Sequence, residues 1–258
     1  MRKSFIIIPL FFILSCKENK KSHLPDIELK AITADFTNWW QYFNSDIDLS
    51  SDFIAYDSSS NKIEKLQFLE ELTTGGFVPI KIKTENTTQN TYQLYTIDNS
   101  DISTTIKAQS ETELSYLKRV GKKFPDFNFT DLNGQNITSL NTKGKHIIIK
   151  TWFINCTACV KEFPELNELT NFYSNREDIV FISLAYDKEE KLKEFLLKKP
   201  LNYNNIKVAQ EYIEDTLKFT QYPTHIVIDE KGNINKIFNN ANRLRSYLNS
   251  KIKEKRKN

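Results

Sequence analysis

The sequence predicts an α/β fold in which helices flank a central mixed β-sheet, preceded by a small α+β N-terminal domain. The main observation is a set of three short runs rich in isoleucine and valine, which are typical of strands covered on both faces. The runs span residues 146–150, 179–185 and 225–228, and apolar residues recur at helical spacing between them. Strands that alternate with helices indicate helices packed on the faces of one sheet.

Composition limits the classes of protein to which this chain can belong. It has 258 residues, 39% hydrophobic and 27% charged, as in a folded chain of one large or two small domains. The formal net charge of +3 is too small to suggest nucleic acid, and we expect no nucleic-acid partner. Three cysteines are too few for a disulfide scaffold or a cysteine-rich zinc array, and we expect neither a metal nor a cofactor.

The first residues have the pattern of an export signal. Arg2 and Lys3 precede an apolar run over residues 5–14, about half of the length that a membrane-spanning helix needs. Cys16 ends the run in a way that resembles a bacterial lipobox. We therefore predict a lipoprotein signal peptide over residues 1–15 and lipid on Cys16, with an ordinary signal peptide or a buried thiol as the alternatives.

Residues 16–25 are polar and are predicted to be a tether, and residues 26–118 are predicted to form the small α+β domain. Strands are expected at 80–83 and 91–97. We find no catalytic constellation in this domain, and docking to a partner or dimerisation is our hypothesis for it. Two helices are predicted there, from apolar spacing and from a capping box, and their residues are Ile63, Leu66, Leu69 and Leu72 for the first and Ser110 with Glu113 for the second.

Residues 119–258 form the second predicted domain, and its chemistry lies in Cys156 and Cys159. The pair follows the strand that ends near Trp152 and begins the next helix, the context in which a C-x-x-C motif is redox-active. Cysteines three apart in a first helical turn face the same side and reach disulfide geometry. Unpaired amides at the helix start favour the thiolate of Cys156, the predicted nucleophile, and Cys159 then attacks the mixed disulfide.

Two other uses of the pair fit the sequence less well. A structural zinc site needs four ligands, and the chain has no second cysteine pair and only three histidines. A purely structural disulfide between Cys156 and Cys159 closes so short a loop that it hardly constrains the unfolded chain.

The stretch WFINCTACVKEFPELN, from Trp152 to Asn167, resembles the thioredoxin superfamily, and it is most similar to the TlpA/ResA-like thiol–disulfide oxidoreductases. The resemblance extends over about residues 121–258, including the lead-in at 122–134, and leaves out the N-terminal domain. It implies a thioredoxin-like fold with an extra hairpin and a helix-containing insertion. It also implies that the enzyme is a protein-disulfide reductase.

The resemblance assigns roles to further residues. Pro164 matches a proline that kinks the active-site helix. Tyr222 and Pro223 match a cis-proline loop that offers its backbone to the substrate, and we predict that these two and Trp152 contact the substrate. Glu162 occupies the position of a glutamate that manages protons in cytochrome-maturation members. It would accept the proton of the buried cysteine if burial raises its pKa, and an exposed helix glutamate is the alternative.

The chain also departs from the pattern of these relatives. Lys150 stands where cytoplasmic thioredoxins keep a buried acid, and we interpret it as a side chain that reaches solvent from the strand end. Asn155 replaces the usual tryptophan before the first cysteine. A peroxiredoxin-like peroxidase is one alternative, but Phe153 stands at its threonine position. A copper-binding thioredoxin-fold lipoprotein using His225 is the other, although those proteins space their cysteines C-x-x-x-C.

The resemblance and the predicted lipid together place the protein in the bacterial cell envelope, lipid-anchored and facing the periplasm. No histidine lies between Cys156 and Cys159, unlike in strongly oxidising members, so we predict a reductant. The expected partners are exported proteins that carry disulfides, an integral-membrane thiol electron donor, and the membrane itself.

Overall fold

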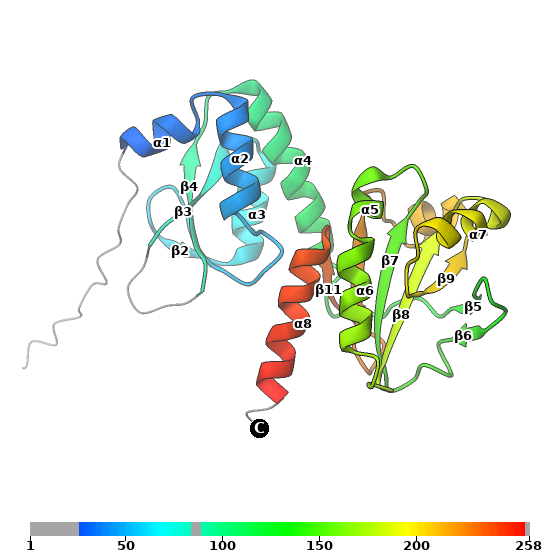
Figure 1. The fold of residues 1–258 in the computed structure, drawn as a ribbon. Coiled ribbons are helices and arrows are strands. Elements are labelled where there is room, and N and C mark those ends of the chain that lie inside the picture. The colour runs from blue at the N-terminus through cyan, green and yellow to red at the C-terminus, as the bar shows by residue number, and fades with distance from the viewer. Residues whose placement is uncertain (1–25, 84–88, 256–258) are drawn as a thin grey trace, which may run out of the picture.

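The computed structural model describes residues 26–83 and 89–255, so the predicted signal peptide, Cys16 and the tether lie outside the described residues. The chain folds around two main β-sheets, one in each half (Figure 1). Within the described ranges no helix is both long and apolar enough to cross a bilayer.

The N-terminal half contains a four-stranded sheet in the order β2-β1-β4-β3. Strands β1 and β4 are parallel and the other pairs are antiparallel. Trp39, Phe68 and Tyr92 are fully buried between this sheet and its helices. The elements are α1 (Asp26–Ile32), α2 (Phe36–Asp46), β1 (Ile54–Tyr56), β2 (Lys62–Ile63), α3 (Lys65–Thr73), β3 (Phe77–Lys81), β4 (Thr91–Thr96) and α4 (Ser100–Leu117).

The two helices predicted in this half exist, but both begin elsewhere than the sequence suggested. Helix α3 starts after Ile63, which lies in β2, and Leu66 is 43% exposed. Helix α4 starts before Ser110, because Asn99 caps it. Its side-chain oxygen accepts hydrogen bonds from the backbone N–H groups of Asp101 and Ile102, each with a donor–acceptor distance of 3.1 Å. A Ser-x-x-Glu pattern places two side chains on one face of any helix, so the pattern alone does not locate an N-terminus.

The C-terminal half contains a five-stranded mixed sheet in the order β11-β10-β7-β8-β9, which confirms the predicted fold class. Strands β7, β8 and β9 are parallel, and β10 runs antiparallel to both β7 and β11. A small hairpin, β5–β6, precedes it. The elements are β5 (Asn128–Thr130), β6 (Asn136–Thr138), β7 (His146–Trp152), α5 (Thr157–Lys161), α6 (Phe163–Phe172), β8 (Ile179–Ala185), α7 (Glu189–Lys198), β9 (Asn204–Lys207), the π-helical turn η1 (Tyr212–Thr216), β10 (Thr224–Ile228), β11 (Ile234–Phe238) and α8 (Ala241–Lys255).

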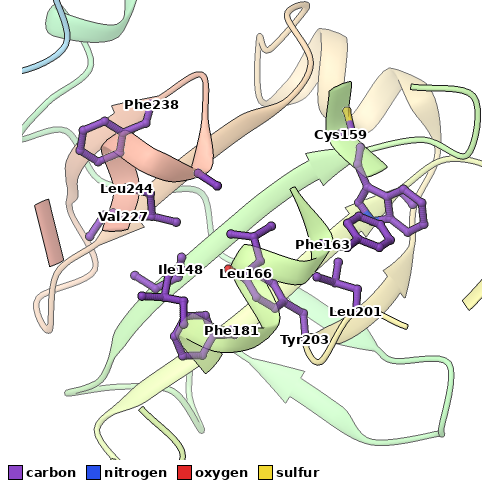
Figure 2. Packing of buried hydrophobic residues seen from close by; sticks show 14 of the residues in the cluster. Ile148, Cys159, Phe163, Leu166, Phe181, Leu201, Tyr203, Val227, Phe238 and Leu244 are labelled. Atoms are coloured by element: carbon purple, nitrogen blue, oxygen red, sulfur yellow. The ribbon is translucent and has the colours of Figure 1, made fainter. Parts of the chain in front are cut away.

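Strand β7 shows why the apolar runs are continuous. Ile148 packs into the cluster on the face that carries α6 and α8, whereas Ile147 and Ile149 pack into the cluster on the opposite face. Figure 2 shows Ile148 beside Leu166 of α6, with Cys159 at one end of the same cluster. Because both faces of the sheet are covered, successive residues of the strand are buried.

Helix α4 and helix α8 lie where the two halves meet (Figure 1). Ile102 and Ile106 of α4 belong to the N-terminal core, but Tyr116 near the end of α4 belongs to the core of the second half. From α8, Arg243 reaches the N-terminal half, where its Nε lies 3.1 Å from Asp48 Oδ1. The two sheets are therefore joined by a shared helix and by charged contacts.

Candidate active site

Strand β7 leads the chain to the redox motif. The strand ends at Trp152, and Cys156 is the N-cap residue of α5. Cys156 and Cys159 form a disulfide, and their Cα atoms are 5.2 Å apart. Cys156 is 8% exposed and Cys159 is fully buried, so Cys156 is the more accessible of the two residues to a substrate.

The backbone around Cys156 supplies hydrogen-bond donors to the site. The N–H of Cys159 donates to Sγ of Cys156 over 3.2 Å, a contact that favours the thiolate over the thiol once the disulfide is reduced. The N–H of Ile154 donates to Asp187 Oδ2 over 2.8 Å, which ties the loop before Cys156 to the end of β8. These two hydrogen bonds fix the backbone on either side of Cys156.

The active-site helix is divided in two at Glu162. Helix α5 ends at Lys161 and α6 begins at Phe163, with Pro164 in the first turn of α6. Proline lacks the N–H that would continue the hydrogen-bond ladder, so a helix tolerates it in its first turn. The kink expected at Pro164 is thus a junction between two helices, and Glu162 lies at that junction.

Trp152 is a core residue in the structure, whereas the sequence predicted a surface contact with the substrate. Its side chain is fully buried, with ring centroids 5.0 Å from Phe163 and 6.0 Å from Phe195. Its Nε1–H donates to Ser183 Oγ over 3.1 Å. The inward face of β7 includes this residue, which packs the sheet against α6 and α7 and leaves no surface for a ligand.

A group of three aromatic residues packs around the loop between β7 and α5. The Tyr222–Pro223 bond is cis, as the family resemblance implied, and Tyr222 is half-buried against the cluster that holds both cysteines. Phe153 stacks on Tyr186 with ring centroids 5.2 Å apart and meets the edge of Tyr222 at 5.4 Å. Phe153 and Tyr186 were missed, although each directly follows one of two neighbouring parallel strands, whose carboxyl ends share one edge of the sheet.

Glu162 makes a set of polar contacts that the sequence did not indicate. Its Oε2 lies 2.6 Å from Nζ of Lys150 on β7 and 3.0 Å from Nε2 of His225 on β10. Its Oε1 accepts the backbone N–H of Ala241 at the start of α8 over 2.8 Å. Lys150 and His225 are fully buried, so the idea that Lys150 reaches solvent is wrong.

The charges of this network follow from these contacts. Burial by itself raises the pKa of Glu162, but its contacts with His225 and then with Lys150 outweigh burial and lower the pKa to about 2. Burial first, and then the Lys150 ammonium, lower the pKa of His225, so its ring is neutral and we assign the donating proton to Nε2. The raised pKa that a proton-accepting Glu162 needs is therefore absent.

A cleft of about 760 Å³ lies beside the motif on the side of α6 and α7. Ile154, Val160, Phe163 and Phe195 give it an apolar lining, and Asn155 places it next to Cys156 in the chain.

The arrangement does not suit copper binding through His225. That residue is buried and its Nε2 contacts Glu162, away from any open ligand position. Across residues 26–83 and 89–255, no group of three or more histidine, cysteine, aspartate and glutamate side chains is placed to hold a metal ion.

Comparison with known proteins identifies the family. The Redoxin profile matches residues 119–252, more than half of the chain. The chain belongs to the Redoxin family. It is 31% identical over 117 residues to the thiol–disulfide oxidoreductase ResA of Bacillus cereus, and the aligned segment spans 45% of this chain and 67% of that protein. It is 27% identical over 119 residues to the thioredoxin-like protein YneN of Bacillus subtilis, and the aligned segment spans 45% of this chain and 69% of that protein.

A solved structure, a putative protein disulfide isomerase from Bacteroides thetaiotaomicron, covers 52% of this chain and 89% of its own with 22% identity and a TM-score of 0.48. The Redoxin domain of this chain, with its mixed sheet and paired cysteines, makes it a thioredoxin-fold thiol–disulfide oxidoreductase similar to ResA. The matched segment begins after α4, so the comparisons assign nothing to the N-terminal half.

Proposed function

We propose that this Redoxin protein is a lipid-anchored reductase that faces the periplasm and reduces disulfides in exported proteins. The thiolate of Cys156 attacks one sulfur of a substrate disulfide, forming a mixed disulfide and releasing the other substrate sulfur as a thiolate. Cys159 then attacks Cys156, and its proton goes to the departing substrate sulfur. Two electrons pass to the substrate, and the Cys156–Cys159 disulfide re-forms.

The difference in burial between the two cysteines is the observation that carries this proposal. Cys156 is 8% exposed, accepts a hydrogen bond from the Cys159 N–H, and belongs to the cluster against which Phe153 and Tyr222 of the aromatic group pack. Cys159 is fully buried, so it attacks only after a substrate is bound to Cys156. The cis-proline loop, whose Tyr222 packs against the cluster that holds Cys156, and the apolar cleft beside the motif are the expected contacts for the substrate backbone and side chains.

The mixed disulfide can be trapped. Cys159→Ala should accumulate substrates linked to Cys156, because the residue that resolves the intermediate is gone. Mass spectrometry of the linked species in cell-envelope extracts, before and after reduction, would name them, and Cys156→Ala is the matched control. If Cys159→Ala captures no more protein than that control, the nucleophile assignment is wrong.

The direction of the reaction can be measured separately. Equilibrating the purified protein with glutathione or dithiothreitol couples gives the potential of the pair. If the protein is a reductant, the reduction potential of the pair should be well below the value of about −120 mV that is typical of strong oxidants. A potential near that value would contradict the reductase.

The lipid anchor is proposed from the sequence before residue 26, and the membrane electron donor from the family resemblance together with that anchor. If Cys16 carries lipid, cells fed a labelled fatty acid should label the wild type, and Cys16→Ala should lose both the label and the membrane fraction. Recovery of an integral-membrane thiol protein on a Cys156→Ala variant, whose remaining active-site cysteine is Cys159, would contradict electron delivery through Cys156. Recovery on Cys159→Ala would support it.

A further inference from the structure

Lys150 occupies the middle of a buried strand, where a lysine has no route to water. In the sheet it is paired with Ser183 of β8 on one side and His225 of β10 on the other. It shares a face of β7 with Ile148 and Trp152, the face that α6 covers. Its side chain is fully buried, and such a charge is stable only if an opposite charge compensates it.

Glu162 supplies that opposite charge. The carboxylate receives the Lys150 ammonium, the His225 ring N–H and the Ala241 backbone N–H, so both of its oxygens are occupied by donors from three different elements. These elements are β7, β10 and α8. Glu162 is also the residue at which α5 meets α6, three positions after Cys159. The carboxylate therefore fastens the end of the active-site helix to the sheet and to the last helix.

We propose that Lys150 is a positioning residue that holds Glu162 as a permanent carboxylate, so that Glu162 anchors the active-site helix and exchanges no proton with the cysteine pair. Glu162, at the position where the related proteins have a proton-managing glutamate, thus serves in this chain as an anchor for the helix. Protons pass directly between sulfur atoms, since the departing substrate thiolate takes the proton of Cys159. This proposal needs only the redox activity of the pair and holds for a reductant or an oxidant.

Within the described residues, four ionisable groups face Glu162. Lys150 and His225 contact it directly, Glu165 lies one helical turn further along α6, and Tyr203 lies beside β9. The pKa of Tyr203 is raised by burial and that of Glu165 is also raised, mainly by burial. Neither group brings a positive charge. The His225 ring and the Lys150 ammonium together keep Glu162 ionised, and with the ring neutral Lys150 is the cation of the pair.

The direct test follows the carboxyl group of Glu162 in the reduced protein. With carbon-13 in the glutamate side chains, NMR reports ionisation of each carboxyl, and Glu162→Gln identifies the signal. We expect this signal to stay constant from pH 4 to pH 9. A signal that titrates within this range in the wild type would overturn the proposal, and this measurement needs no variant at Lys150.

The second test uses thiol chemistry. The alkylation rate of reduced Cys156 against pH should follow a single thiol ionisation in the wild type. Lys150→Met should add a second step, because the Glu162–His225 pair then gains and loses one proton in this range and the nearby charge changes the rate by about tenfold. The double variant Lys150→Met with Glu162→Gln should return to one step.

The number of ionisation steps in Lys150→Met separates a positioning role of Lys150 from simple packing. A single step in Lys150→Met would mean that Lys150 only fills space, and the proposal would fall. Lys193→Met is the matched control, since Lys193 makes a 2.6 Å contact with Glu189 on the exposed surface of α7 and should leave the profile unchanged. Circular dichroism of each variant confirms folding, and a Lys150→Met protein that does not fold leaves the NMR experiment to decide.

Discussion

Glu162 at the active site and Glu113 at the junction of the two halves are both buried helix-associated carboxyl groups, yet their charges differ. Glu162 lies 2.6 Å from Lys150, and its pKa is lowered to about 2. Glu113, on α4, lies 3.9 Å from Arg243, and burial raises its pKa to about 7 despite the charges of Arg243 and Lys65. Glu113 is more deeply buried, with 7% of its side chain exposed against 13% for Glu162, and its contact with a cation is longer, so burial and contact distance together set the charge.

This difference divides the molecule into a fixed region and a region that responds to pH. At Glu162 three donors satisfy the carboxylate, so the active-site helix is held in the same way over the physiological range. At Glu113 the carboxyl gains or loses a proton near neutrality, where α4 meets α8 and the N-terminal half. Near the cysteines the charge of Glu162 therefore stays constant around neutral pH, whereas at the junction with the N-terminal half the charge of Glu113 changes with pH.

Removing the buried cation should have the largest effect on stability. Lys150→Met leaves Glu162 without its closest charge, and loss of one partner of a buried pair costs about 4 kcal/mol. The double variant with Glu162→Gln should recover more than half of that loss, because no buried charge remains. Urea unfolding at pH 7 measures both. A double variant no more stable than Lys150→Met would show that the two side chains do not act as a pair.

Glu113 should make the protein less stable as pH rises towards neutrality. Its pKa is raised from 4.5 to about 7 in the folded state, so the folded protein binds more protons than the unfolded chain between these values. The stabilisation is complete below pH 4.5 and is lost as pH rises through 7, with a size on the order of 3 kcal/mol. Glu113→Gln should remove this dependence. Denaturant unfolding of both proteins from pH 4.5 to 8 tests it, and parallel curves would refute it.

Glu162 should act in the opposite sense and in a more acidic window. Its folded pKa of about 2 lies below the ordinary value of 4.5, so the unfolded chain binds more protons in between. The stabilisation is present above pH 4.5 and is lost on acidification towards pH 2, again on the order of 3 kcal/mol. We expect the wild type to lose more stability than Glu162→Gln over this range. Equal losses would mean that Glu162 is not held as a carboxylate.

The smallest effect is expected at Lys193. Its Nζ lies 2.6 Å from Glu189, the same distance as in the Lys150–Glu162 pair, but both side chains are about half exposed. Because water and salt screen exposed charges, Lys193→Ala should change the unfolding free energy by less than about 0.5 kcal/mol. A loss of more than 1 kcal/mol would break the comparison, since distance and not burial would then set the strength of the pair.

Much of the fold was predictable because strands and helices have different spacing of apolar residues. The runs at 146–150, 179–185 and 225–228 are three central strands of one sheet, as their uninterrupted apolar character required. Helix ends were less predictable, because a local cap at Asn99 decided the start of α4, whereas the capping-box pattern at Ser110 lies inside the helix.

The sequence by itself determined the chemistry of the site, since Cys156 and Cys159 after a buried strand specify a redox pair whatever surrounds them. It also marked Glu162 and Lys150 as unusual positions. Only the tertiary structure joined them, because the chain between these two positions, which are 12 apart in the sequence, folds so that a strand and a helix junction meet in the core. Charge in a protein interior depends on which groups touch, and those contacts are made between elements that are distant in the chain.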